Sequence, residues 1–268
     1  MTIEPHIVVE LLALGSFTGF LAGLLGIGGS LIMVPFLTWM LARQGVNSAY
    51  VVHAAIATSL ATIMLSALSS LRAHHRRGAV RWDIVFALTP GILLGAYVGS
   101  AISSHLDGRL LGLIFGGFLL FSALQMVANL RPKRVRQLPA APGMVAAGGA
   151  IGSVAGMVGA GGGFLSVPFM TWCNVPIHNA VGTSAALGFP IALAGTVGYV
   201  VNGWHTPGMP QYTLGFVYVP ALLVIAAASM SLAPLGARVA HSMDTRRLRY
   251  AFALLLTVLG TNMIVHSV

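Results

Sequence analysis

Charged residues are scarce in this chain, and acidic ones are the scarcest. Of its 268 residues only 7% are charged, five are Asp or Glu, and 57% are hydrophobic. A water-soluble domain of this length needs more charge to cover its surface, so the composition excludes that class and predicts an integral membrane protein. Neither an enzyme nor a nucleic-acid-binding protein is expected.

Cysteine and buried carboxylates are also lacking. The single cysteine, Cys173, excludes an internal disulfide framework and a cysteine metal cluster, and no cofactor is expected. No Asp or Glu falls in the middle of an apolar segment. A transporter of a naked cation would be expected to carry a carboxylate there, so small anions fit better than cations.

Apolar segments long enough to cross a bilayer are plentiful, since crossing takes about 20 residues in a helix. They occupy residues 8–27, 50–71, 84–104, 110–129, 144–160, 179–201, 213–235 and 248–266. Two shorter pieces, near 31–42 and 164–173, cannot span alone, and each follows a glycine-rich break. The predicted fold is therefore an all-α membrane protein, and the sequence leaves open whether the short helices cross or are re-entrant.

Positive charge is concentrated in three loops, which together hold 12 of the 14 Lys and Arg residues. These residues are Arg72, Arg76, Arg77 and Arg81, then Arg131, Lys133, Arg134 and Arg136, then Arg238, Arg246, Arg247 and Arg249. Short basic loops stay on the cytoplasmic side, so all three are predicted to lie inside and both termini outside. The net charge of +9 is read as a topology signal.

The chain contains an internal repeat. Residues 15–39 laid over residues 148–172, a shift of 133, are identical at 12 of 25 positions, most of them Gly, Pro, Phe, Thr or Trp. Further matches follow at other shifts, including His53 with His178 and Thr58-Ser59 with Thr183-Ser184 at 125. We therefore expect a first transmembrane repeat over 1–130, a basic cytoplasmic linker over 131–142 and a second repeat over 143–268.

Loop charge indicates that the two repeats have opposite orientations. The loop at 72–81 is strongly basic, whereas its counterpart at 202–211 has no formal charge. The next pair reverses this, since 104–109 has one cation and 238–249 is basic. Two inverted-topology repeats, each with a glycine-broken helix pair and three long transmembrane helices, are typical of secondary transporters.

The glycine-rich breaks are candidate binding sites. Non-helical backbone at membrane depth must be buried in protein or line a cavity, and the helix that restarts after it offers unpaired amides suited to an anion. The hydroxyl groups of the matched Thr-Ser pairs are further candidate contacts. The predicted substrate-binding residues are Gly28, Gly29, Ser30, Thr58, Ser59, Gly161, Gly162, Gly163, Thr183 and Ser184.

The matched histidines His53 and His178, with Asn179, are candidates for proton coupling or anion contact. Simpler roles stay open for all of these residues. Helical Ser and Thr often bond to the carbonyl four residues back, and each histidine can sit at the membrane interface. The glycines spaced by four, from Gly15 to Gly23 and from Gly148 to Gly156, are typical of close helix packing.

The segments GLLGIGGSLIMVPFL and GMVGAGGGFLSVPFM, with VGTSAALG, resemble the sulfite exporter TauE/SafE family of bacterial permeases. The likeness covers roughly residues 8–266. It implies a multi-pass protein of the bacterial cytoplasmic (inner) membrane that moves sulfite, sulfoacetate or a related small organic anion, often outward. The second copy departs from the first in having Gly163 where Ser30 stands.

Four other functions are weighed against this exporter. An anion channel, or an uptake permease for another small organic anion, would use the same fold. A scaffold for a partner protein is disfavoured because no sizeable soluble domain is present. An intramembrane hydrolase using Ser59 or Ser184 is least favoured, because the spacing of His178 and Thr183 does not place them on one helix face and no acidic orienting group is available.

Overall fold

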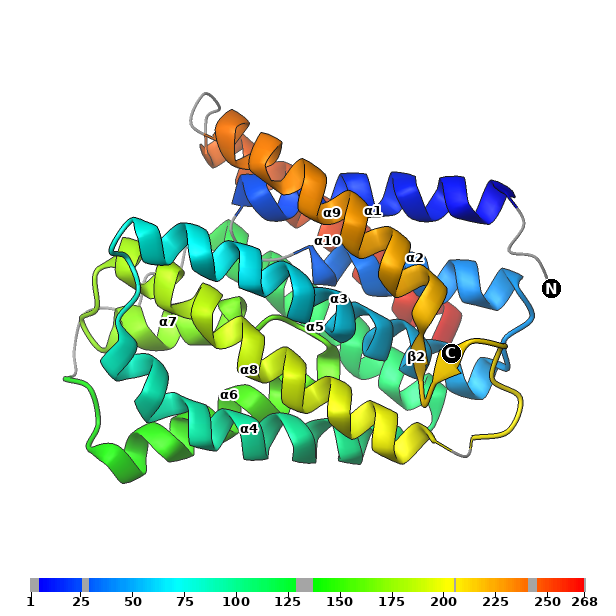
Figure 1. The fold of residues 1–268 in the computed structure, drawn as a ribbon, viewed down its shortest axis with the longest axis horizontal. Helices are drawn as coiled ribbons and strands as arrows, with labels where there is room; N and C mark the ends of the chain where they lie inside the picture. The colour runs from blue at the N-terminus through cyan, green and yellow to red at the C-terminus, as the bar shows by residue number, and fades with distance from the viewer. Residues whose placement is uncertain (1–4, 26–28, 129–136, 205, 241–244, 268) are drawn as a thin grey trace.

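The computed structural model describes residues 5–25, 29–128, 137–204, 206–240 and 245–267. Within them are ten helices and one small hairpin (Figure 1). The first five helices are α1 Pro5–Leu25, α2 Ser30–Arg43, α3 Ser48–Arg76, α4 Trp82–Ser104 and α5 Gly108–Ala128. The others are α6 Ala141–Val158, α7 Gly163–Trp172, α8 Ile177–Gly203, α9 Val219–Ala240 and α10 Thr245–Ser267, with strands β1 Thr213–Leu214 and β2 Val217–Tyr218 before α9.

The helical prediction is confirmed, with one error. Six of the described helices, α3, α4, α5, α6, α8 and α10, are long and apolar enough to cross a membrane. The segment predicted as helix over 213–235 instead begins with the β1–β2 hairpin, and α9 starts at Val219. The hairpin turns at Gly215, which has φ +57°, and a Cβ there would overlap the carbonyl of Val200. A helix cannot pass through a residue held in this left-handed conformation.

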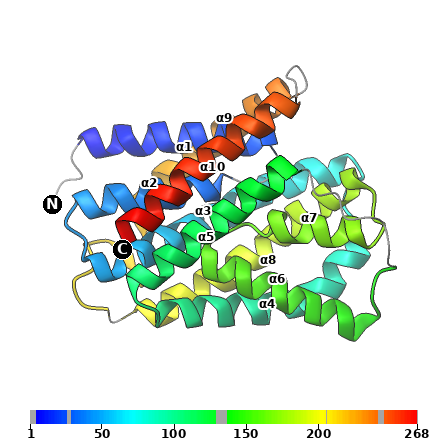
Figure 2. The same ribbon diagram turned by 180° about the vertical axis from the view of Figure 1, so that it is seen from behind.

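Each short helix turns back along the molecule. Figure 1 shows α2 running in the direction opposite to α1, and α7 in the direction opposite to α6, and Figure 2 shows the same from behind. Both short helices lie within one residue of their predicted bounds, at Ser30–Arg43 and Gly163–Trp172. The helix pairs around the two breaks are therefore hairpins.

The principal helix contacts join the first five helices to the last five. Helix α4 packs along α6, α1 along α9, α5 along α10 and α3 along α8. Exchanging α1–α5 with α6–α10 reproduces this set of contacts, and each helix of the second group runs opposite to its counterpart in Figure 1. The orientation of the two halves in a bilayer and the boundaries at 130 and 143 stay predictions. The linker is described only from residue 137, and α6 begins at Ala141.

The glycines spaced by four lie at two of these contacts. A Cβ at Gly15 would lie 2.8 Å from the Ile225 carbonyl oxygen on α9, and one at Gly152 would lie 2.5 Å from the Ile92 carbonyl oxygen on α4. Gly19, Gly148 and Gly156 meet main-chain atoms of the same partner helices. The predicted close-packing role is confirmed for these five glycines; the side-chain surroundings of Gly23 lie outside the described residues.

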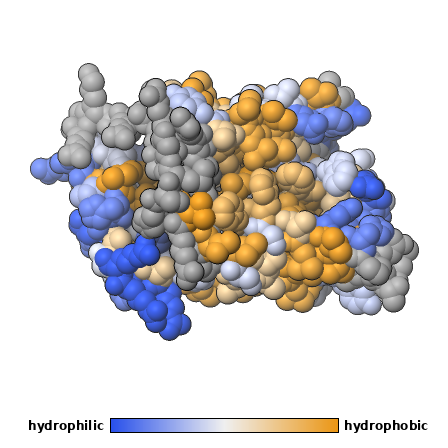
Figure 3. All heavy atoms as spheres, turned by 90° about the horizontal axis from the view of Figure 1, so that it is seen from above, coloured by the Kyte–Doolittle hydropathy of each residue, from blue (hydrophilic) through white to orange (hydrophobic). Residues whose placement is uncertain are grey.

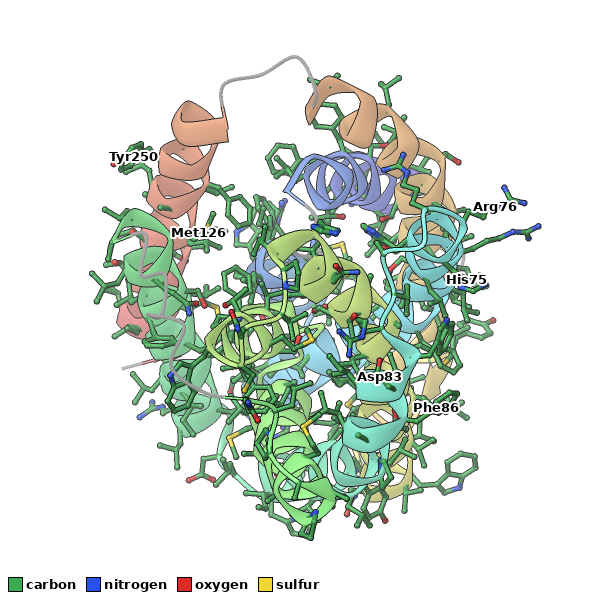
Figure 4. The ribbon with its side chains drawn as sticks, turned by 90° about the vertical axis from the view of Figure 1, so that its left-hand side faces the viewer. His75, Arg76, Asp83, Phe86, Met126 and Tyr250 are labelled. Carbon is green, nitrogen blue, oxygen red and sulfur yellow. The ribbon has the colours of Figure 1, made fainter. Side chains whose placement is uncertain are left out.

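One face of the molecule has an apolar middle and polar ends. Figure 3 shows hydrophobic residues across the middle of one face and hydrophilic residues toward both ends. Figure 4 looks at one end, where Arg76 and Asp83 flank the α3–α4 loop, and Met126 and Tyr250 lie near the neighbouring ends of α5 and α10. The helix ends that border all three basic loops therefore lie at the same end of the molecule (Figure 1).

Candidate functional site at the two broken helices

The second break is a tight turn between α6 and α7. Gly159 has φ +64° and Gly162 has φ +73°, so the chain adopts the left-handed conformation twice within four residues. Glycine adopts it without the steric cost that a Cβ imposes. The amide of Ala160 still bonds to the Ala155 carbonyl at 3.0 Å, so α6 ends in a closed turn before α7 begins at Gly163.

This turn lies about halfway along the two central helices. A Cβ at Gly159 would lie 2.8 Å from Ile56 Cγ2, and one at Gly161 would lie 3.7 Å from Ile63 Cγ2, both in the middle part of α3. On the other side, a Cβ at Gly162 would overlap Ile191, near the middle of α8. The break is therefore enclosed by protein at mid-depth, as backbone without helical bonds requires in a membrane.

Both short helices start with the same hydrogen bonds. The carbonyl of Gly29 accepts from the amides of Ile32 (3.2 Å) and Met33 (3.1 Å). The carbonyl of Gly162 accepts from those of Leu165 (3.0 Å) and Ser166 (2.8 Å), at the shift of 133 that the sequence repeat predicts.

The first two amides of each short helix have no backbone hydrogen-bond partner in the described part of the chain. They belong to Ser30 and Leu31 in α2 and to Gly163 and Phe164 in α7. Such amides are the groups that bind anions at helix starts. Gly28 lies outside the described residues.

Two hydroxyl groups predicted to belong to the site of the first half are buried without a hydrogen bond, as is Ser122 on α5. Ser30 is 1% exposed and Ser59 is 0% exposed, and neither Oγ atom has a partner. In the second half Ser184, the counterpart of Ser59, accepts a 2.8 Å hydrogen bond from Ser166 Oγ. The residue of α2 that corresponds to Ser166 is Met33, which cannot provide this bond. The halves therefore differ in hydroxyl pairing at matched positions.

The two threonines of the Thr-Ser pairs accept hydrogen bonds from amides at helix starts of the opposite half. Thr58 Oγ1 accepts from the amide of Tyr218, the residue before α9, at 3.0 Å. Thr183 Oγ1 accepts from the amide of Arg81, the residue before α4, also at 3.0 Å. Helix starts leave amides unpaired, and each threonine satisfies one of them. The structure thus gives both hydroxyls a bond within the protein, while their predicted substrate contact stays a prediction.

The two matched histidines have different surroundings. His53 is 1% exposed, and its Nε2 donates toward the carbonyls of Ser103 (2.9 Å) and Leu106 (3.1 Å) at the end of α4. Its ring stacks on Phe216 with a centroid separation of 5.2 Å. His178 is exposed at the start of α8. The pair was predicted from matched positions, and the structure shows that the positions are not equivalent.

Asn179 also has a contact within the protein, because its side-chain amide donates to the Ala79 carbonyl at 3.2 Å. This bond joins the start of α8 to the α3–α4 loop. In the described chain no group of three or more His, Cys, Asp or Glu side chains is arranged to hold a metal ion.

The predicted site residues do not all meet at one point. Helices α3 and α8 are antiparallel, with Gly195 against Leu60 and Gly188 against Ala67. Continuing this register places Ser184 opposite Leu71, about 18 Å along α3 from Ser59 at about 1.5 Å per residue. Ser59 and Ser184 therefore lie at different levels along the α3–α8 pair.

The sequence did not identify three hydrogen-bond partners of the Thr-Ser pairs, namely Ser166 and the amides of Arg81 and Tyr218. The two amides belong to backbone that any residue could supply, so no sequence signal marks them. Ser166 could have been found by asking which polar residues of one repeat are replaced by apolar ones in the other, since it stands opposite Met33.

Known proteins are similar to this chain over nearly its whole length. The family model described as sulfite exporter TauE/SafE matches residues 11–263. A probable membrane transporter protein of Haemophilus influenzae is 35% identical over 253 residues, which cover 94% of this chain and 96% of that protein. Another of Methanocaldococcus jannaschii is 25% identical over 259 residues, covering 95% and 94%, and one of Xylella fastidiosa is 34% identical over 207 residues, covering 74% and 76%. No solved structure matches significantly.

Proposed function

The chain belongs to the sulfite exporter TauE/SafE family of membrane transporters, and we propose that it moves a small oxyanion by alternating access between its two halves. Sulfite or a related sulfur-containing or organic anion is the first choice of substrate, and export is the direction. The observation that supports this most strongly is the pair of short helices, each of which starts with amides that have no backbone partner among the described residues.

The buried polar groups favour an anion. The described buried polar side chains are Ser, Thr and one His, with no Asp or Glu among them. Hydroxyl and amide groups are neutral and can donate hydrogen bonds to an oxyanion. A buried carboxylate would instead favour a cation.

The proposed topology places the end with the three basic loops in the cytoplasm of the bacterial inner membrane. Arg72, Arg76 and Arg77 are exposed at this end, as cytoplasmic cations should be. The start of α1 and the end of α10 lie at the opposite end in Figure 1, so both termini would face outside. A cysteine-accessibility experiment with residues introduced next to Arg76 and near the start of α1 would test this orientation.

The decisive test of function is transport by the purified full-length protein in proteoliposomes. Labelled sulfite, sulfate, thiosulfate and sulfoacetate are offered one at a time, each with and without a pH gradient. We expect saturable uptake of at least one of these anions, accelerated by the same unlabelled anion on the other side. Linear, unsaturated flux would indicate a channel, and absence of flux for all four anions would contradict the proposal.

A further inference from the structure

The β1–β2 hairpin is buried between the two halves, at the end of the molecule where α1 starts and α10 ends (Figure 1). Phe216 is 1% exposed, Val217 is 2% exposed and Tyr218 is 6% exposed. The ring of Phe216 stacks on His53 of α3 at a centroid separation of 5.2 Å and meets Tyr199 of α8 edge-on at 6.3 Å. One aromatic ring of the hairpin therefore contacts a central helix of each half.

Both central helices are shaped to receive the hairpin. A Cβ at Gly203, the last residue of α8, would lie 2.5 Å from Phe216 Cδ2, so the helix packs there without a side chain. On the other side, the amide of Tyr218 donates to Thr58 at 3.0 Å. Thr58 follows Ser48, the first residue of α3, by ten residues, which is about 15 Å along the helix at about 1.5 Å per residue. The hairpin therefore closes this end of the molecule to a considerable depth.

The opposite end is closed by a shorter connection, residues 77–81 between α3 and α4. It contacts the start of α8, because the amide of Arg81 donates to Thr183 and the carbonyl of Ala79 accepts from Asn179. Each residue of 77–81 is exposed or half-buried. The matched threonines thus hold a connection of the opposite half at each end, but only the hairpin buries an aromatic side chain there.

The hairpin can leave α3 without breaking a helix. A two-stranded hairpin is barely stable by itself in water, so packing on the central helices keeps this one in place. The Phe216 ring and the hydrogen bond to Thr58 hold it to α3. Alternating access requires that the contacts between the halves separate at one end while they persist at the other.

Resting on the proposed transport function and orientation, we propose that the β1–β2 hairpin is the outer gate and that Phe216 is the residue that closes it. In the outward-open state the hairpin moves off α3 as one body. Residues 77–81 form the inner gate, which opens separately. The structure has both gates closed.

The test ties the hairpin to α3 in the full-length protein, in proteoliposomes that take up the best transported anion. Tyr50→Cys combined with Phe216→Cys places two thiols where the ring centroids are 5.9 Å apart. A short bifunctional methanethiosulfonate reagent then bridges them through disulfides that dithiothreitol breaks. We expect bridging to lower uptake about tenfold or more, with recovery on reduction, because every cycle needs the gate to open. A monofunctional reagent on the same variant should leave most of the uptake.

The matched control bridges the hairpin to itself. Thr213 and Tyr218 are paired across the two strands, so cysteines there have Cβ atoms about 4.5–5.5 Å apart. Bridging Thr213→Cys with Tyr218→Cys leaves the hairpin free to move off α3, and uptake should stay within about twofold of the unbridged variant. A loss as large as in the first variant would contradict movement of the hairpin as one body.

If Phe216→Cys does not fold, amide hydrogen exchange of the wild-type protein replaces the bridging experiment. Adding the transported anion should speed exchange of residues 213–219 and leave exchange in the middle of α3 unchanged. Exchange of the hairpin that does not respond to the anion would show a fixed structural plug.

The outcomes separate the gate from the function beneath it. Undiminished uptake after complete bridging of Tyr50→Cys and Phe216→Cys would overturn the gate and leave the transport function standing. A wild-type protein that transports none of the anions would remove the proposed function and the gate with it.

Discussion

The short helices of the first and second halves start with the same backbone hydrogen bonds and have different side chains around these starts. In both, a glycine carbonyl accepts from the third and fourth following amides, and a threonine holds a helix start of the opposite half. The side chains around this shared frame differ, because Ser59 is unpaired where Ser184 is bonded, and His53 is buried where His178 is exposed. The two helix starts therefore share backbone hydrogen bonds while the matched side chains around them differ.

The largest effect should appear when Gly29, the residue before α2, receives a methyl group. In Gly29→Ala the new Cβ would lie 2.5 Å from the Thr18 carbonyl oxygen, which is main chain and cannot turn aside. Overpacking of this kind costs about 3 kcal/mol or more of folding free energy. We expect a sharp fall in the melting temperature of the detergent-purified protein, or loss of the folded protein.

Gly161→Ala at the second break is the control, because a Cβ there would meet only Ile63 Cγ2, at an ordinary 3.7 Å. Its melting temperature should stay within a few degrees of wild type. Equal losses in Gly29→Ala and Gly161→Ala would contradict this account of the packing.

Replacing the two histidines by glutamine should give the next largest contrast. His53→Gln loses bonds to two carbonyls at the end of α4 and should cost about 1–3 kcal/mol. His178→Gln changes an exposed residue and should stay within about 0.5 kcal/mol of wild type. Thermal unfolding of both variants measures the difference, and a greater loss in His178→Gln would contradict the structure.

The double variant His53→Gln with His178→Gln tests proton coupling. If either histidine carries the coupling proton, the stimulation of transport by a pH gradient should be lost while exchange of substrate persists. An unchanged dependence of transport on pH would remove both histidines from the coupling mechanism.

The threonine bonds should differ by a smaller amount. Thr58→Val and Thr183→Val keep the side-chain shape and leave a helix-start amide unpaired in each case. The Thr58 bond is fully buried, whereas the Thr183 bond to Arg81 is partly exposed. Since water can replace a lost partner only where it has access, we expect about 2 kcal/mol for Thr58→Val and about 1 kcal/mol for Thr183→Val. A reversed order in thermal unfolding would contradict this reasoning.

The smallest effect is expected at the surface of the basic end. Arg81 and Asp83 form an ion pair with exposed side chains, separated by 2.6 Å. The neighbouring Asp83 carboxylate raises the pKa of the Arg81 guanidinium, so the pair stays charged at neutral pH. Asp83→Asn should change stability by less than about 1 kcal/mol, because exposed ion pairs are screened by water. A clear shift in melting temperature would show that the pair is more protected than its exposure indicates.

Much of the architecture could be predicted because membrane insertion constrains sequence strongly. The short helices at 31–42 and 164–173 were predicted to within one residue of their starts, since glycine breaks and flanking polar residues mark them. The helix predicted over 213–235 failed at its beginning, where apolar residues such as Phe216 and Val217 are buried in a hairpin. Apolar composition records burial, and it does not distinguish a strand from a helix over so few residues.

The candidate site was only partly predictable for a different reason. Repeat matching found Ser59, Ser184 and both threonines, but it treated matched residues as equivalent. Hydrogen-bond partners decide their roles, and these come from distant segments, such as Tyr218 for Thr58 and Ser166 for Ser184. Sequence position alone does not show which hydroxyl group has a hydrogen-bond partner.

The contacts of the outer helices bear on how the chain is made. Helix α1 packs on α9, α4 on α6 and α5 on α10, and Thr58 accepts a hydrogen bond from the amide of Tyr218. The first five helices leave the ribosome before any of these partners exists. They must therefore remain in the bilayer as an incomplete assembly until the rest of the chain is inserted. The first five helices complete these contacts only when the last five are present.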